Sequence, residues 1–230
     1  MSGTSSRETR PNRVILRPLG AKRDGLRICV RHSTAIASKT VVRDTPVRFD
    51  SQAEWAEWLA THCATSTGVW LRLAKRRADQ RSVSYAEALE VALCYGWIDG
   101  QKKGESEHHW LQRFTPRSAR SLWSKINRER ALKLIQEGRM EAAGLEEIER
   151  AKSDGRWEAA YDSSSAATVP SDLQAALDAN KRAKSFFATL DARNRYAILF
   201  RLQTAKKAET RTKRLQQFVE MLSRHEKLHP

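Results

Sequence analysis

From residue 47 onward, the hydrophobic and polar positions follow two different periods, and together they predict a mixed α and β structure. Residues 51–63 place apolar side chains three and four positions apart, as in an amphipathic helix, and Ser51 with Glu54 has the pattern of a capping box. Residues 69–74 instead alternate apolar and polar positions, as a half-buried strand does. A second capping-box pattern, Ser84 with Glu87, predicts a helix that Gly96 is placed to end.

The next segment predicts a β-hairpin followed by a helix. Residues 97–99 and 108–114 have strand patterns, and a polar turn containing glycine joins them. Pro116 ends the second strand, and the helix that follows has Ser121 or Ser124 as its N-cap. Hairpin pairing implies an antiparallel sheet, so we expect an α+β domain with a small antiparallel sheet over residues 47–138.

After residue 138 the periodicity is helical throughout. The last helix is expected from about residue 209 to residue 224, with an apolar stripe along one side. We therefore predict a mainly helical C-terminal domain over residues 139–230. Residues 1–46 are basic and lack sustained periodicity, and they are predicted to form a mostly disordered N-terminal extension.

The net charge of +15 is concentrated at the two ends of the chain. Residues 1–48 hold eleven Arg/Lys against three Asp/Glu, and residues 161–230 hold thirteen against seven, whereas residues 49–160 are nearly neutral. Basic ends attract polyanions, which makes a nucleic-acid-binding module one alternative reading. Its candidate contacts near the C-terminus are Lys206, Lys207, Arg211, Lys213 and Arg214.

Several classes of protein are disfavoured. No apolar run approaches the roughly 18 to 20 residues that span a bilayer, and the first residues lack the apolar region of a secretory signal, so we expect a cytoplasmic protein. The three cysteines form no CxxC pair, which argues against a disulfide framework and a zinc site and favours a reducing compartment. The common nucleotide, hydrolase and metalloprotease motifs are missing, so no cofactor and no metal are predicted.

The candidate chemistry lies in a window without acids, from His108 to Arg128. This window runs from a strand end to a predicted helix N-terminus, where free N–H groups and the helix dipole favour an anion. Its arginines suit bidentate contact with phosphate or carboxylate. The predicted site for a small anionic ligand comprises Trp97, Asp99, Trp110, Arg113, Arg117, Ser121, Trp123, Ser124 and Asn127.

Structural readings of the same residues remain open. The arginines could pair with Asp99, Glu105, Glu107 or the acids around residues 146–149. The tryptophans fit an aromatic core as well as a stacking groove, with Trp110 and Trp123 the better groove candidates. A buried Asp99 or His109 in a deep pocket would instead favour a small-molecule enzyme acting on a phosphate- or carboxylate-bearing substrate.

The succession "ALCYGWIDG", "FTPR" and "SLWSKIN", with "EGRMEAAGLEEIERAKSDGRW" and "AKKAETRTKR", resembles the bacterial YdeI/OmpD-associated family, also called bacteriocin-protection proteins. The resemblance spans about residues 47–224. It implies a stress-tolerance protein associated with resistance to antimicrobial peptides, acting by binding to a protein, a peptide or a small anion rather than by catalysis. It transfers no catalytic residues.

Overall fold

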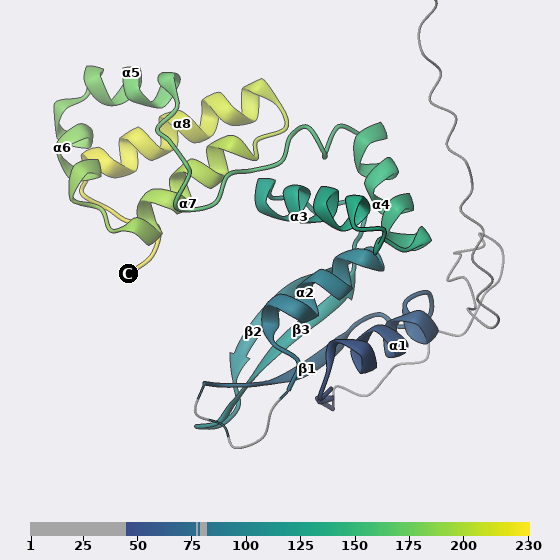
Figure 1. The fold of residues 1–230 in the computed structure, drawn as a ribbon. Helices are drawn as coiled ribbons and strands as arrows, with labels where there is room; N and C mark the ends of the chain where they lie inside the picture. Colours follow the sequence, from purple (N-terminus) through teal and green to yellow (C-terminus); the bar gives the residue numbers. More distant parts are fainter. Residues whose placement is uncertain (1–44, 77, 79–81) are drawn as a thin grey trace, which may run out of the picture.

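In this computed structural model, the described residues are 45–76, 78 and 82–230. The α+β prediction is confirmed: a three-stranded antiparallel sheet is combined with helices, and the C-terminal part is helical (Figure 1). The predicted N-terminal extension, apart from residues 45 and 46, lies outside the described residues.

The sheet is formed by β1 (Val69–Ala74), β2 (Trp97–Gly104) and β3 (His109–Pro116), in the order β1-β3-β2. The predicted hairpin is β2–β3, but both strands are longer than the sequence pattern indicated. The reason is a register shift between Asp99 and Lys102, after which pairing with β3 resumes. The buried Gln112 side chain donates to the carbonyls of Gly100 and Gln101, each at 3.1 Å, and so satisfies the backbone that the shift leaves unpaired.

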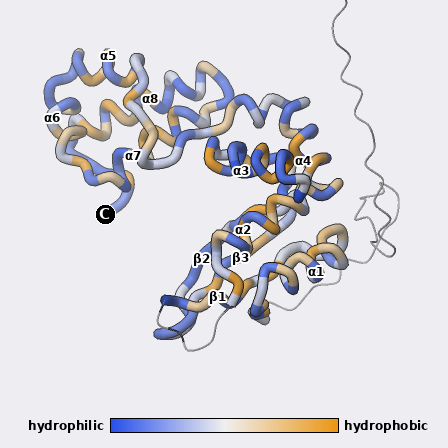
Figure 2. The backbone as a smooth tube through the Cα atoms, in the orientation of Figure 1, coloured by the Kyte–Doolittle hydropathy of each residue, from blue (hydrophilic) through white to orange (hydrophobic). Residues whose placement is uncertain are grey.

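Two helices pack on the apolar face of this sheet: α1 (Gln52–His62) and α2 (Tyr85–Cys94). The capping box predicted at Ser84 is present in full. At α1 the prediction is half right, because Ser51 accepts from the Glu54 N–H but the Glu54 carboxylate reaches the Asp50 N–H, at 2.8 Å, instead of the Ser51 N–H. Figure 2 shows apolar residues along α2, and hydrophilic ones along much of β2 and at the hairpin tip.

Two further helices, α3 (Lys125–Gln136) and α4 (Ala142–Ser153), contribute to the same core as the sheet. Ser124 is the N-cap of α3, with its Oγ accepting from the Asn127 N–H at 3.1 Å. Gly138 follows the helix with a positive φ of 67°, as its place after the last apolar turn indicated.

The remaining helices are α5 (Ser171–Ala179), α6 (Lys181–Thr189), α7 (Ala192–Gln203) and α8 (Ala208–Ser223), and they enclose a second core. The first core draws on residues 49–160 and the second on residues further along the chain. Figure 1 shows the sheet with α1 and α2 at one end, α5–α8 at the other, and α3 and α4 between them.

Asp162 joins the two parts of the molecule. Its carboxylate pairs with Lys125 of α3 at 2.6 Å and accepts from the Gln203 side chain of α7 at 2.8 Å. Its carbonyl accepts from the Tyr196 hydroxyl at 2.8 Å. The segment before α5 is therefore bonded to both cores.

Candidate functional site

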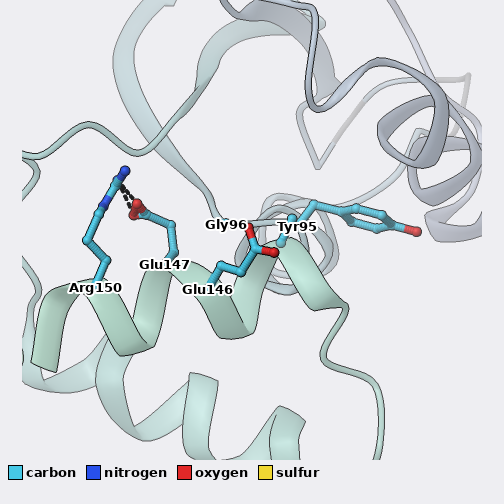
Figure 3. A pocket seen from close by; sticks show the side chains of 6 residues that line it. Tyr95, Gly96, Glu146, Glu147 and Arg150 are labelled. Atoms are coloured by element: carbon cyan, nitrogen blue, oxygen red, sulfur yellow. Dashed lines mark hydrogen bonds and ion pairs between the residues drawn. The ribbon is translucent and has the colours of Figure 1, made fainter. Parts of the chain in front are cut away.

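The loop between β3 and α3 begins at Arg117, whose backbone is fixed on both sides. The Arg117 N–H donates to the Gly96 carbonyl at 3.0 Å, and its own carbonyl accepts from the Arg150 guanidinium at 3.3 Å. Arg150 is in turn paired with the buried Glu147, as Figure 3 shows. These two α4 residues line a cavity of about 210 Å³ next to Gly96, on the backbone side of Arg117.

The Arg117 side chain is buried with only 2% of its surface exposed. Its guanidinium carbon lies 3.6 Å from the centroid of the Trp123 ring, and Nη1 donates to the Leu122 carbonyl at 3.0 Å. Nε and Nη2, which form the other edge of the guanidinium, have no hydrogen-bond partner among the described residues. Burial lowers the pKa of Arg117 to about 9, against the opposing influence of Tyr161 and Asp99.

A second buried arginine, Arg156, approaches the same loop. Its Nε donates to the Asp154 carboxylate at 2.8 Å and its Nη1 to the Ser121 carbonyl at 2.9 Å. Its Nη2 is buried without a partner in the described part of the chain. The sequence interpretation missed this residue; the signal available was its place before Trp157 in the "SDGRW" stretch.

Trp123 lies between the two arginines and the start of α3. Its ring meets Trp157 edge-on at 4.8 Å, and its Nε1 is a fourth buried donor around this loop for which the described residues provide no acceptor. The next residue, Ser124, caps α3, and the first turn of that helix contains no acid. The helix itself therefore places no negative side chain at the positive end of its dipole, and the carboxylate of Asp162, from outside the helix, is paired with Lys125.

Asp99 and Tyr161 lie close enough to Arg117 to oppose the lowering of its pKa, and Tyr85 is bonded to Asp99. The Tyr85 hydroxyl donates to Asp99 at 2.7 Å, and burial together with this bond raises the pKa of Tyr85. Burial and the charge of Asp99 also raise the pKa of Tyr161, which the positive charge of Arg117 opposes. Asp99 thus influences Arg117 through its charge, while its hydrogen bond goes to Tyr85.

The structure brings together Asp99, Arg117, Ser121, Trp123, Ser124 and Asn127 of the predicted set, with Arg156 and Tyr161 in addition. Trp97 lies in the core, fully buried, with Nε1 donating to the Cys63 carbonyl at 3.3 Å. Arg113 is on the other face of β3 from the buried Phe114 and lies over Trp70, at 5.7 Å from the ring. Trp110 contacts Tyr85 at 5.9 Å and carries Lys102 over its ring.

The basic residues proposed for nucleic-acid contact differ in whether they bond to other groups of the chain. Arg211 pairs with Asp172 at 2.7 Å and also donates to the Leu202 carbonyl, and Arg214 donates to the Arg201 carbonyl. Lys206, Lys207 and Lys213 are exposed. A polyanion would therefore meet these three lysines first.

The described residues also bear on the cysteine and membrane expectations. Cys94 is free and buried, and burial raises the pKa of its thiol to about 11. Cys63 is disulfide-bonded, a bond that the spacing of the cysteines did not predict. No group of three or more His, Cys, Asp or Glu residues in the described ranges is placed to hold a metal ion. None of the helices described has both the length and the apolar character that crossing a bilayer requires.

Comparison with protein families gives two matches on different parts of the chain. Residues 166–225 match the family described as bacteriocin-protection, YdeI or OmpD-associated, which confirms the suspected family for this part of the chain. Residues 47–147, which carry the tryptophan and arginine motifs, match a family described only as a domain of unknown function, DUF8412. No curated protein and no solved structure matches the chain.

Proposed function

We propose that this chain, whose residues 166–225 match the bacteriocin-protection, YdeI or OmpD-associated family, is a bacterial stress-tolerance protein that acts by binding. Its binding site lies in the other part of the chain, at the loop between β3 and α3, and its ligand carries a small anionic group. The family match supports the general role, and the geometry of the loop supports the anion.

The observation that carries the anion site is the state of Arg117. Burying a cation is unfavourable unless it is paired and hydrogen-bonded. The Arg117 guanidinium makes one hydrogen bond, to a carbonyl, and no ion pair with a carboxylate of the described residues. Its Nε–Nη2 edge is the two-donor fork that matches a carboxylate or phosphate. An anion bound there would supply a directly paired charge and the acceptors that Nε and Nη2 lack among the described residues.

A thermal-shift experiment tests this proposal. The melting temperature of the full chain is measured with sodium phosphate, sodium acetate and short oligonucleotides, at low and at high sodium chloride. A ligand at one hundred times its Kd adds about 2.7 kcal/mol to the stability of the folded state. We expect a shift with at least one small anion that persists at high salt, because a buried site is screened less than a surface.

Two variants locate the site. Arg117→Met keeps most of the side-chain volume but removes the charge, and we expect it to abolish the shift. Arg120→Gln is the matched control, because Arg120 is exposed in the same loop. A shift that survives in Arg117→Met, or that disappears in Arg120→Gln alone, would contradict the proposed site. Shifts with oligonucleotides only, erased by salt, would move the function to the basic residues.

A further inference from the structure

Arg156 and Arg117 bind to neighbouring positions of one loop. Arg117 Nη1 donates to the Leu122 carbonyl at 3.0 Å, and Arg156 Nη1 donates to the Ser121 carbonyl at 2.9 Å. Two guanidinium groups anchored on consecutive carbonyls lie close together, and the charge of Arg156 accordingly contributes to the lowered pKa of Arg117. Like charges repel each other in a medium of low dielectric, so this pairing needs a compensating charge.

The nearby carboxylates meet this need only in part. Asp154 is bonded to Arg156. Desolvation acts to raise the pKa of Asp154, but the hydrogen bonds from Arg156 and the charges of Arg156 and Lys206 hold this pKa below its usual value. Asp99 directs its hydrogen bond to Tyr85. Arg117 therefore has nearby negative charge but no direct acceptor for Nε or Nη2 within the described residues.

The unused groups around this loop are all donors. They are Nε and Nη2 of Arg117, Nη2 of Arg156 and Nε1 of Trp123, and each is buried. A carboxylate has two oxygens, which the Arg117 edge would occupy on its own. A phosphate group offers three or four oxygens and two charges, enough for the donors of both arginines and of Trp123.

We propose that this site takes a doubly charged oxyanion of the phosphate type, free or as a monoester, held by Arg117 and Arg156 together. The inference rests on the proposed anion site and specifies its ligand class. Arg117 supplies the two-point contact, and Arg156 Nη2 and Trp123 Nε1 supply donors for the remaining oxygens. The N-terminus of α3, capped by Ser124 and without acids in its first turn, adds a favourable field for the same charge.

Access requires a local movement, because these donor atoms are buried. Residues 118–120 follow the end of β3 and precede the two carbonyls that the arginines bind, and they are exposed. They form a turn in which Ser121 Oγ accepts from the Ser118 N–H at 2.9 Å. Opening of this turn would admit the ligand. We expect association to be slower than for an open surface site for that reason.

The test is isothermal titration of the full chain at about pH 8 with inorganic phosphate, glycerol phosphate and acetate, since phosphate is doubly charged at a pH above its second pKa of about 6 to 7. We expect acetate to bind at least about tenfold more weakly than phosphate, because a hydrogen bond between charged groups contributes more than about 1.5 kcal/mol. Binding of the ester as well as the free ion identifies a monoester site, and binding of inorganic phosphate alone identifies the free ion; both support the proposal.

Three variants assign the role of Arg156. Arg156→Gln is expected to weaken phosphate binding about tenfold or more while changing acetate binding by less than about twofold. Asp154→Asn removes the carboxylate that competes for Arg156, and we expect it to strengthen phosphate binding several-fold. A purely structural Arg156 would give the opposite sign, because losing its carboxylate partner would loosen the loop. Arg117→Met abolishes binding of every anion.

Two results would overturn the inference, and they are distinguishable. If acetate binds as tightly as phosphate and neither Arg156→Gln nor Asp154→Asn alters binding, the site exists but takes a singly charged group at Arg117 alone. If no anion binds to a wild-type chain that melts cooperatively, the proposed anion site fails along with the inference.

Discussion

Arg117 holds a positive charge in a place where the folded chain gives it one carbonyl oxygen and the face of an indole ring. A buried charge of this kind stabilises a fold only when the geometry around it is complete. Because an apolar side chain of similar size would be tolerated at this position, the presence of Arg117 is better explained by ligand binding than by stability. At the scale of the residue, stability and binding should therefore respond differently to the same substitution.

The first prediction follows from this difference. Arg117→Met loses the hydrogen bond to Leu122 and the contact of the charge with Trp123, but it also removes the unfavourable burial of the cation. We expect the free energy of unfolding without ligand to change by less than about 1 kcal/mol, measured by urea denaturation. A loss of about 3 kcal/mol or more would show that Arg117 holds the fold together, in which case its unused edge would not indicate a ligand site.

At the scale of the element, the position of α4 is set by a glycine. A Cβ on Gly144 would overlap the carbonyl oxygen of Cys94 at the end of α2 and the sulfur of Met140. The close approach lets α4 hold Arg150 against the Arg117 carbonyl, while Arg150 is paired with Glu147, as Figure 3 shows. Helix packing at Gly144 therefore supports the loop that carries the candidate site.

We expect Gly144→Ala to destabilise the protein by about 1 to 3 kcal/mol, although alanine favours helices over glycine by about 1 kcal/mol. The matched control is Gly104→Ala, because a Cβ at Gly104 meets nothing within 4 Å. That variant should stay within about 0.5 kcal/mol of the parent. Equal stabilities for the two variants in thermal denaturation would show that the α2–α4 contact is less close than described.

The helices of the second core are tied by an ion pair that depends on pH. Hydrogen bonds from Arg211 in α8 hold the pKa of Asp172 in α5 below its ordinary value of 3.8, although burial acts in the opposite direction. A carboxyl group with a lowered folded pKa stabilises the fold above its unfolded pKa. That contribution is lost as the pH falls below 3.8 and through the lower folded value.

Accordingly, Asp172→Asn should lose less stability than the parent on acidification over this range, and should already be less stable at neutral pH. Thermal melts of both proteins from neutral to acidic pH measure the effect. Glu209→Gln, at the exposed first turn of α8, is the comparison and should keep the full acid sensitivity of the parent. Parallel curves for Asp172→Asn and the parent would rule out a role for this pair.

At the scale of the whole molecule, Asp162 joins the parts of the chain that form the two cores. Residues 47–147, in the first part, and residues 166–225, in the second, match different families. The buried donors of Arg117 and Trp123 lie in the part that matches the domain of unknown function, and Arg156 lies between the two matched parts. The exposed lysines lie in the part that matches the bacteriocin-protection family. The two binding readings of this protein therefore belong to different halves and can be tested separately.

Any affinity for nucleic acid should depend on Lys206, Lys207 and Lys213 rather than on Arg211, which is committed to Asp172. Replacing the three lysines by glutamine should make the salt dependence of oligonucleotide binding shallower by about two to three units of log K against log salt. The same replacement at Lys75, Lys102 and Lys103 provides a charge-matched control at the hairpin end. A similar loss in both triple variants would indicate attraction to net charge alone.

The sequence by itself determined the structural features that depend on residues close together along the chain. The capping boxes, the alternation in residues 69–74 and the glycine after α3 are local patterns whose physics acts within a few positions, so the α+β class and most element positions followed from them. The acid-free window likewise pointed to Arg117, Trp123 and the N-terminus of α3. The bulge that lengthens the hairpin was not predictable, because it depends on Gln112 bonding across to Gly100 and Gln101.

Only the tertiary structure decided which charged groups meet. Arg156 reaches the Ser121 carbonyl across 35 positions. Arg113 lies over Trp70, on the face of β3 opposite the buried Phe114, because alternate residues of a strand point to opposite faces. The same folding sends the Asp99 hydrogen bond to Tyr85 and so leaves one edge of Arg117 without an acceptor in the described chain. Whether a buried charge is satisfied depends on every group that packs against it, and most of those groups are distant in sequence.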